Sequence, residues 1–278
     1  MPDAQVISCS RRTDIPRCYS GWLEEVLALG SVTFRAPRGA ARHISLAPED
    51  VHSMVLWSKD YAPLLQRPSL VKQLQRLNCY FHFTITGLGR TGWEPEIPPW
   101  SAALAQMTVL VRLFGARRVN WRFDPVVHWS SDDKRRSNLS LFPRIAAQVA
   151  GLGVGSCTFS LVQPYRKNER RAQRSGLEII RLAGDEGLEA AAQLAEWSTG
   201  FGLGLYSCAE EAWLQVPGVS RASCVDAGLL NALRPDGMKA SAAKDGSQRR
   251  QCGCSRSIDI GSYTQRCGAA QCLYCYAN

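Results

Sequence analysis

The stretch that decides the fold lies near the start of the chain, where residues 6–10 read VISCS and residues 11–16 read RRTDIP. The first run is apolar or small and favours a buried strand. The second run is abruptly polar. In α/β proteins, polar groups of this kind follow the carboxyl ends of parallel strands, where binding and catalytic sites are assembled.

The same pattern recurs along the chain and predicts the fold class. Amphipathic stretches with helical spacing separate the strand-like runs, which favours a parallel sheet with right-handed crossovers. We therefore expect an α/β protein built as a partial (β/α)6 TIM-like barrel. A hairpin over 31–35 and 43–46 is expected as an insertion after the first unit. The further strand-like runs are residues 53–57, 79–86, 118–124, 157–162 and 203–208.

Helices are predicted between these runs. Ser20 is the expected N-cap of a helix that stops at Gly30, and Asp185 is the expected cap of a later helix. The chain is interpreted as a single domain, 1–278. Its expected parts are a barrel core over 1–210, a connecting segment over 211–251, and a cysteine-rich metal-binding tail over 252–278.

Charged residues at the predicted strand ends form the candidate catalytic set. Arginines there can hold a phosphate or carboxylate, and carboxylates can contact substrate or move protons. The alternative is that these side chains form salt bridges that close the rim of the sheet. The set comprises Arg12, Asp14, Arg122, Asp124, Glu210 and Glu211.

Composition limits the class of protein. The 278 residues carry a formal net charge of +9 and are 45% apolar, which is typical of a globular protein. No apolar stretch is long enough to span a bilayer, and the first residues lack the features of a signal peptide. We expect a cytoplasmic protein with no membrane partner. Its 11 cysteines are an odd number, which argues against a disulfide framework.

Five cysteines crowd the last 27 residues, which indicates a metal site. Closely spaced thiolates hold iron–sulfur clusters, and three of them on a 4Fe–4S cluster leave one iron open to a small molecule. Zinc is the competing interpretation, because a Cys-x2-Cys pair also suits a tetrahedral sulfur site. Cys9, Cys18, Cys79 and Cys157 are interpreted as core residues. The tail cysteines are Cys252, Cys254, Cys267, Cys272 and Cys275.

A second metal site is also predicted. Cys208 and Cys224, together with Cys252 and Cys254, supply four thiols, enough for an auxiliary cluster or a structural zinc. The alternative is that Cys208 and Cys224 are ordinary buried residues.

The segments 10–16, 121–125, 208–211 and 252–278 resemble the bacterial family called domain of unknown function 1848. The tail of that family resembles the cluster motif that radical S-adenosylmethionine (SAM) enzymes carry near the N-terminus of a (β/α)6 barrel. The resemblance implies an iron–sulfur protein with Cys267, Cys272 and Cys275 as cluster ligands. The spacing here is four residues and then two, whereas radical SAM enzymes usually have three and then two.

The resemblance also implies an activity, namely reductive cleavage of SAM to a 5′-deoxyadenosyl radical that takes hydrogen from a substrate. Tyr274 is expected to shield the cluster from water. The usual Gly-Gly-Glu segment that holds the methionyl amine is replaced by residues 57–60. The candidate cofactor-binding residues are Trp57, Lys59, Thr84, Thr86, Ser160 and Tyr274.

Expected partners are a small-molecule substrate or a nucleic acid, and an electron donor such as a flavodoxin or ferredoxin. Basic clusters such as 134–136 attract polyanions, although a solvated loop explains that run equally well. The alternative function is a barrel stabilised by zinc or an iron–sulfur cluster that binds a nucleotide or nucleic acid without radical chemistry.

Overall fold

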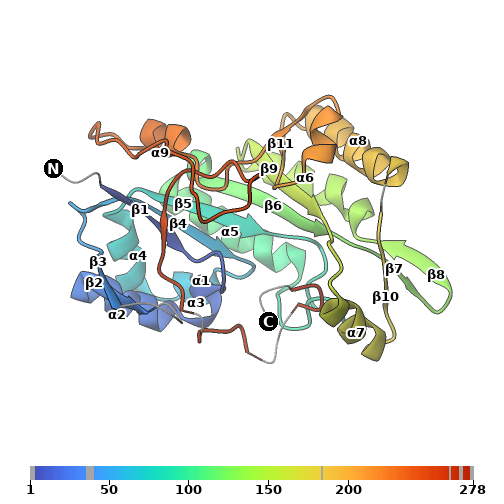
Figure 1. Cartoon of the computed structure of the whole chain (residues 1–278), viewed down its shortest axis with the longest axis horizontal. Helices are drawn as coiled ribbons and strands as arrows, with labels where there is room; N and C mark the ends of the chain where they lie inside the picture. The colour runs from blue at the N-terminus through green and yellow to red at the C-terminus, as the bar shows by residue number, and fades with distance from the viewer. Residues whose placement is uncertain (1–3, 36–40, 183, 263, 269–271, 276–278) are drawn as a thin grey trace. The chain divides into compact units, whose positions relative to one another are not determined.

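The computed structural model describes residues 4–35, 41–182, 184–262, 264–268 and 272–275 (Figure 1). The chain divides into two compact units, and each draws on three separate stretches of sequence. The predicted boundaries at 210 and 251 stay predictions. Unit 1 comprises Met1–Phe83, Gln106–Val119 and Ser223–Cys267, and unit 2 comprises Thr84–Ala105, Asn120–Ala222 and Gly268–Asn278.

Unit 1 is built on parallel strands. β1 pairs with β4 on one side and with the short β13 on the other, and β4 pairs with β5. Figure 1 shows the red C-terminal stretch of this unit passing beside β1, which is near the other end of the sequence. The strands are β1 (Gln5–Cys9), β4 (Val51–Ser58), β5 (Cys79–Thr84) and β13 (Ile258–Asp259).

Helices and a hairpin complete unit 1. The hairpin of β2 (Ser31–Arg35) and β3 (Ala41–Ser45) is antiparallel, as predicted. Gly30 ends α2 with φ 69°, a left-handed conformation that favours glycine. Ser20 is the first residue of α2 rather than its cap, because its hydroxyl accepts from Arg67 instead. The helices are α1 (Ile15–Cys18), α2 (Ser20–Leu29), α3 (Ala62–Leu65), α4 (Pro68–Gln75) and α9 (Ala227–Leu233).

Unit 2 has its own parallel strands and an aromatic core. β9 pairs with β6 and β11, and β11 pairs with β12. Trp121 and Phe142 are fully buried and stack with their ring centroids 4.8 Å apart. Asp185 is the first residue of α8 and not its cap. The elements are β6 (Val119–Val126), β9 (Ser156–Leu161), β11 (Gly204–Ser207), β12 (Val219–Arg221), α6 (Phe142–Gly151), α7 (Arg166–Arg174) and α8 (Asp185–Gly200).

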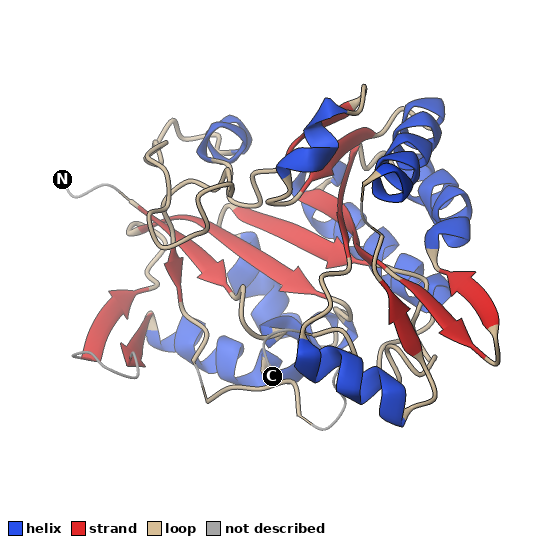
Figure 2. Ribbon diagram, turned by 45° about the vertical axis from the view of Figure 1, so that its right-hand side comes forward, coloured by secondary structure: helices blue, strands red, loops and turns tan. Residues whose placement is uncertain are grey.

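A small antiparallel sheet in unit 2 was not predicted. Its order is β10 (Glu178–Ile180), β7 (His128–Ser131) and β8 (Lys134–Ser137), drawn as separate red arrows in Figure 2. The residues of β8 are basic and exposed, so they lack the apolar alternation that indicates a strand. Asp132 and Asp133 have φ of 50° and 57°, the left-handed pair that a tight two-residue hairpin requires.

The parallel strands form an eight-stranded sheet in the order β12-β11-β9-β6-β5-β4-β1-β13. The prediction of an α/β protein with a parallel sheet is therefore confirmed. A closed barrel is not found among the described strands, since β12 and β13 stand at opposite ends of the order. No helix in the described part of the chain, the longest being α8 and α5 (Trp100–Phe114), is long and apolar enough to cross a bilayer.

Candidate functional site

Asp259 is the centre of the polar network at the end of β1. Its carboxylate accepts hydrogen bonds from the hydroxyls of Ser8 and Ser10 at 2.8 and 2.9 Å. The backbone N–H groups of Arg11 and Gly261 donate to it at 2.8 and 2.9 Å. The register of β13 on β1, which places Asp259 opposite Ser8, brings these groups together. This role of Asp259 was not predicted, because β13 is only two residues long and shows no strand pattern.

Arg12 also belongs to this network. Its Nη1 lies 3.1 Å from Asp259 Oδ1, and its side chain is 37% exposed. The pair is a salt bridge at the strand end, which agrees with the rim alternative for this residue. Because the guanidinium remains partly exposed, it can still meet an anionic ligand.

Asp14 caps α1 and links it to the end of β4. Its carboxylate accepts from the Ser58 hydroxyl at 2.6 Å, the Lys59 N–H at 2.9 Å and the Arg17 N–H at 3.1 Å. Burial raises the pKa of Asp14 to about 6, and the hydrogen bonds from Lys59 and Ser58 oppose the rise. All of its described contacts are structural, and its predicted contact with substrate stays a prediction.

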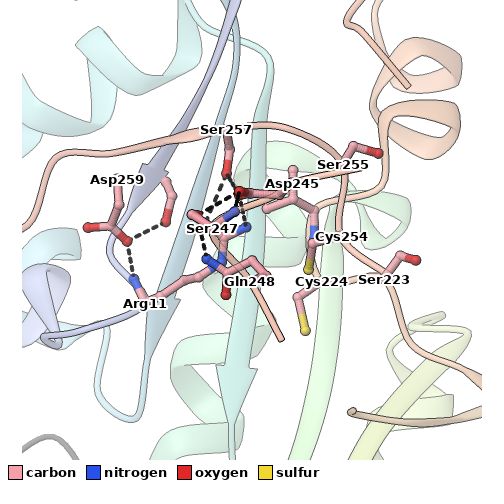
Figure 3. A network of polar contacts seen from close by, with 12 residues as sticks. Arg11, Ser223, Cys224, Asp245, Ser247, Gln248, Cys254, Ser255, Ser257 and Asp259 are labelled. Carbon is pink, nitrogen blue, oxygen red and sulfur yellow. Dashed lines mark hydrogen bonds and ion pairs between the residues drawn. The ribbon is translucent and has the colours of Figure 1, made fainter. Parts of the chain in front are cut away.

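Arg11 lies between the β1 end and the cysteine tail of unit 1 (Figure 3). Its guanidinium donates to Ser257 at 2.9 Å and lies 3.8 Å from the buried Asp245 carboxylate. It also lies over the ring of Trp57, 5.6 Å from the centroid. That ring stacks on His82 at 5.1 Å, so Trp57 has a packing role here and its predicted cofactor contact stays untested.

Three cysteines of unit 1 form a thiol cluster, namely Cys224, Cys252 and Cys254. Cys254 is buried, and Cys224 and Cys252 pack against the same apolar core. Hydrogen bonds with Cys224 and then with Cys252 hold the pKa of Cys254 well below its ordinary value. All eleven cysteines of the chain are thiols outside any disulfide. We call these three residues the 224/252/254 cluster.

Cys267, a predicted cluster ligand, meets Cys18 of α1. Their hydrogen bond raises the pKa of Cys267 and lowers that of Cys18, so the two sulfurs share a proton with Cys18 as its acceptor. Cys18 is half-buried. The interpretation of Cys18 as a plain core residue was therefore wrong, since only the fold of α1 beside the tail reveals its neighbour.

In unit 2, Glu94 organises a buried hydroxyl network. Glu94 is 2% exposed and accepts from the Thr86 hydroxyl at 2.7 Å. The Tyr274 hydroxyl donates to the same carboxylate oxygen. Burial raises the pKa of Tyr274 well above its ordinary value, and the charges of Glu94 and Cys272 add to the rise. Thr86 and Tyr274, both predicted cofactor contacts, thus meet at a residue that the sequence did not single out.

Cys272 and Cys275 are the ends of one tight turn. The Cys275 N–H donates to the Cys272 carbonyl at 3.0 Å. Side chains of α7 bind the backbone of this turn. The Asn168 amide donates to the Tyr274 carbonyl at 2.7 Å, and Arg171 Nη2 donates to the Cys275 carbonyl at 2.8 Å. Both thiols are half-buried. The anchors on this turn are therefore its backbone carbonyl groups and the Tyr274 hydroxyl.

The ends of β6 and β9 bring together three of the predicted residues. The guanidinium of Arg122 pairs with the carboxylate of Asp124, and the Ser160 hydroxyl donates to the other oxygen of that carboxylate. The Arg122 side chain is 9% exposed and the Asp124 side chain is 23% exposed. The Arg122–Asp124 salt bridge agrees with the rim alternative for this pair, the carboxylate is its more accessible partner, and the catalytic role of both residues stays a prediction.

The remaining predicted residues follow β11 and β5. Glu210 accepts from the Gln163 amide at 3.2 Å, and Glu211 pairs with Arg221 at 3.1 Å on the exposed surface. Cys208 is half-buried after the end of β11. Thr84 is the last residue of β5.

The comparison with known proteins decides the family. A family model described as a domain of unknown function (DUF1848) matches residues 6–277, nearly the whole chain. The chain belongs to the DUF1848 family. No match was found among curated proteins. The membership confirms the resemblance drawn from the residues, including the cysteine tail.

The donor chemistry of this DUF1848 protein suits a thiophilic metal. Thiolates are the ligands of iron–sulfur clusters and of structural zinc. In the described part of the chain, no three His, Cys, Asp or Glu side chains already stand in position to hold a metal ion. Ligation by either set of cysteines therefore requires thiol side chains to rotate from the positions described here.

Proposed function

We propose that this DUF1848 protein is an iron–sulfur protein that binds a 4Fe–4S cluster through Cys267, Cys272 and Cys275 and cleaves SAM to start radical chemistry on a small molecule. The main support is the turn from Cys272 to Cys275. It brings two half-buried thiols within one hydrogen-bonded turn, and its backbone is fixed by Asn168 and Arg171. A loop of this kind can wrap a cluster.

Cys267 is assigned as the third ligand by its match to the family motif. Its proton is shared with Cys18, so it loses that proton when it binds metal. The hydrogen bond with Cys18 is the main cause of the raised pKa of Cys267, so metal binding must break that bond and release the proton.

A bound, reduced cluster would supply one electron to SAM, and cleavage of the sulfonium would yield the reactive fragment. The residues of this chain would bind and orient. Tyr274 stays neutral and partly buried, with its hydroxyl on Glu94, and it would shield the Cys272 side of the turn from water. Asp124, with Arg122 and Ser160 fixing its orientation, offers a carboxylate to a hydroxyl or amine of the substrate.

The strand order supports the finer fold assignment, a partial (β/α)6 barrel. The six predicted strands follow one another in chain order, as they do around a TIM barrel. A doubly wound sheet would instead reverse direction at a switch point. We assign the polar strand ends to the substrate side, as in barrels generally. The electron donor is assigned to the flavodoxin or ferredoxin class because a one-electron reductant is required.

Anaerobic reconstitution tests the proposal. The wild-type protein should bind iron and sulfide in equal amounts and, with dithionite and SAM, release 5′-deoxyadenosine. Cys272→Ala and Cys275→Ala should each abolish the binding of iron and sulfide and the release of 5′-deoxyadenosine. Cys157→Ala is the matched control, since that thiol is fully buried in β9 and should leave both unchanged. Cluster loading that persists without Cys272 and Cys275 would overturn the ligand assignment, and a loaded protein that does not cleave SAM would overturn the activity.

A further inference from the structure

The 224/252/254 cluster is not used by the proposed function. The chain builds it by laying two stretches of unit 1 against each other. Ser223 donates to the Gly253 carbonyl at 2.8 Å, and Ser255 N–H donates to the Val225 carbonyl at 2.8 Å. These bonds place Cys224 next to the Cys252-Gly-Cys254 run, although about thirty residues separate them in the sequence.

The backbone also turns toward the sulfur of Cys254. The Val225 N–H lies 3.4 Å from Cys254 Sγ and donates to it. The Asp245 N–H donates to the Cys254 carbonyl at 2.9 Å, which fixes the residue from a third stretch. Amide donors to sulfur are a common outer shell of metal thiolates, because they stabilise the negative charge and orient the ligand.

Arg11 supplies a cation that its described contacts do not fully use. Its Nη2 is buried and has no hydrogen-bond partner among the described residues, although Asp245 lies 3.8 Å away. Figure 3 shows Arg11 in a polar network with Asp245 and Asp259, and it draws Cys224 and Cys254 beside that network. Three thiolates around a divalent cation carry a net negative charge, and a buried guanidinium nearby compensates for it.

We infer that Cys224, Cys252 and Cys254 bind one zinc ion, with the fourth position left to an external ligand such as water. Two thiolates on one tetrahedral zinc lie about 3.8 Å apart, given a zinc–sulfur bond of about 2.3 Å. Cys224 and Cys252 pack with Cys254 around one core, so a single ion asks for less movement of the thiols than a cluster does. Ligands on different irons of a 4Fe–4S cluster stand farther apart.

The side chains must still close on the ion. Cys254 is buried, whereas Cys224 and Cys252 are half-buried, so closure on the ion requires these two side chains to move toward Cys254. The bound ion would join the stretch around Cys224 to the tail around Cys254. Because the ion would link these two stretches, its binding would add to the stability of the fold.

Metal analysis tests the inference. Protein purified without chelators should contain about one zinc per chain, and cobalt exchanged for the zinc should give a thiolate-to-metal charge-transfer band. Cys254→Ser and Cys224→Ser should each lose the zinc, and with it the cobalt–thiolate band. Cys79→Ser, another thiol of unit 1 within a buried strand, should leave both unchanged.

The two proposals can fail separately. Cys254→Ser should keep the iron content of the reconstituted protein, and Cys272→Ala should keep the zinc. If Cys254→Ser fails to fold, Cys224→Ser decides the matter, because its half-buried position tolerates a polar hydroxyl. Wild-type protein that carries no zinc and gives no cobalt–thiolate band would overturn the inference. A band that survives Cys224→Ser, or loss of iron in place of zinc, would overturn it equally.

Discussion

The two units hold the C-terminal stretch of the chain by different main contacts. In unit 1 the main acceptor is a side chain of the tail, since the Asp259 carboxylate receives hydrogen bonds from residues 8–12. In unit 2 the tail offers backbone carbonyls, and side chains of α7 bind them. The difference shows that the unit 1 tail is built into the sheet, whereas the unit 2 tail is fixed as a turn through its backbone.

The largest effect should come from Asp259→Ala. The substitution leaves two hydroxyls and two backbone N–H groups without their acceptor, and the Asp259 side chain that it removes is only 10% exposed. We therefore expect the free energy of unfolding to fall by about 3–5 kcal/mol. Urea unfolding at neutral pH measures it. Asp50→Ala removes an exposed carboxylate of the same unit and should change stability by less than about 0.5 kcal/mol. Similar losses in both variants would contradict the central role of Asp259.

Tyr274→Phe tests the side-chain anchor of the unit 2 turn. Glu94 loses one of its hydroxyl donors in a buried environment, so the free energy of unfolding should fall by about 1–3 kcal/mol. Tyr165→Phe is the control, because Tyr165 is 44% exposed. A double-mutant cycle with Thr86→Val would show coupling if both hydroxyls serve the same carboxylate. If the losses of stability in the two single variants simply add in the double variant, the two hydroxyls are not coupled through the Glu94 carboxylate.

Asp14 makes the stability of the folded protein depend on pH. Its pKa is raised from 3.8 to about 6 by burial, so the folded protein binds the proton more tightly than the unfolded chain does. The contribution of Asp14 to stability is therefore greatest below pH 4 and falls as the pH rises to 6. We expect wild-type protein to lose stability relative to Asp14→Asn across that window, as measured by urea unfolding at several pH values. A difference that does not vary with pH would refute the raised pKa.

The smallest effect should be that of Arg171→Ala on the unit 2 turn. The turn loses the donor to the Cys275 carbonyl but keeps Asn168 and Tyr274, so stability should change little. Local opening should increase, and iodoacetamide should alkylate Cys272 and Cys275 several-fold faster. Arg170→Ala, an exposed residue of the same helix, is the control. Equal alkylation rates in both variants would show that the arginine does not hold the turn.

The main strands could be predicted because their residues alternate or run apolar within buried sheets. All six predicted strands are present, and so is the hairpin, whose turn residues lie outside the described part of the chain. β7, β8 and β10 could not be predicted, because their residues are polar and their pairing is settled by tertiary contacts. β12 and β13 are too short to show a period.

The candidate site was predictable where strand order alone brings residues together. Arg122, Asp124 and Ser160 meet because β6 and β9 are neighbours. Asp259 and Glu94 were missed because each works through contacts with residues that are remote in sequence or in a loop. The same holds for Cys18, whose partner Cys267 is near the other end of the chain.

The pairing of β1 with β13 has a consequence for synthesis. β1 emerges from the ribosome first, yet its outer neighbour is made about 250 residues later. Until then the nascent chain presents an unpaired strand edge, which is a template for aggregation. A parallel contact between such distant residues is also slow to form. Expression should therefore depend strongly on chaperones, and nascent chains released before residue 258 should be the first to precipitate.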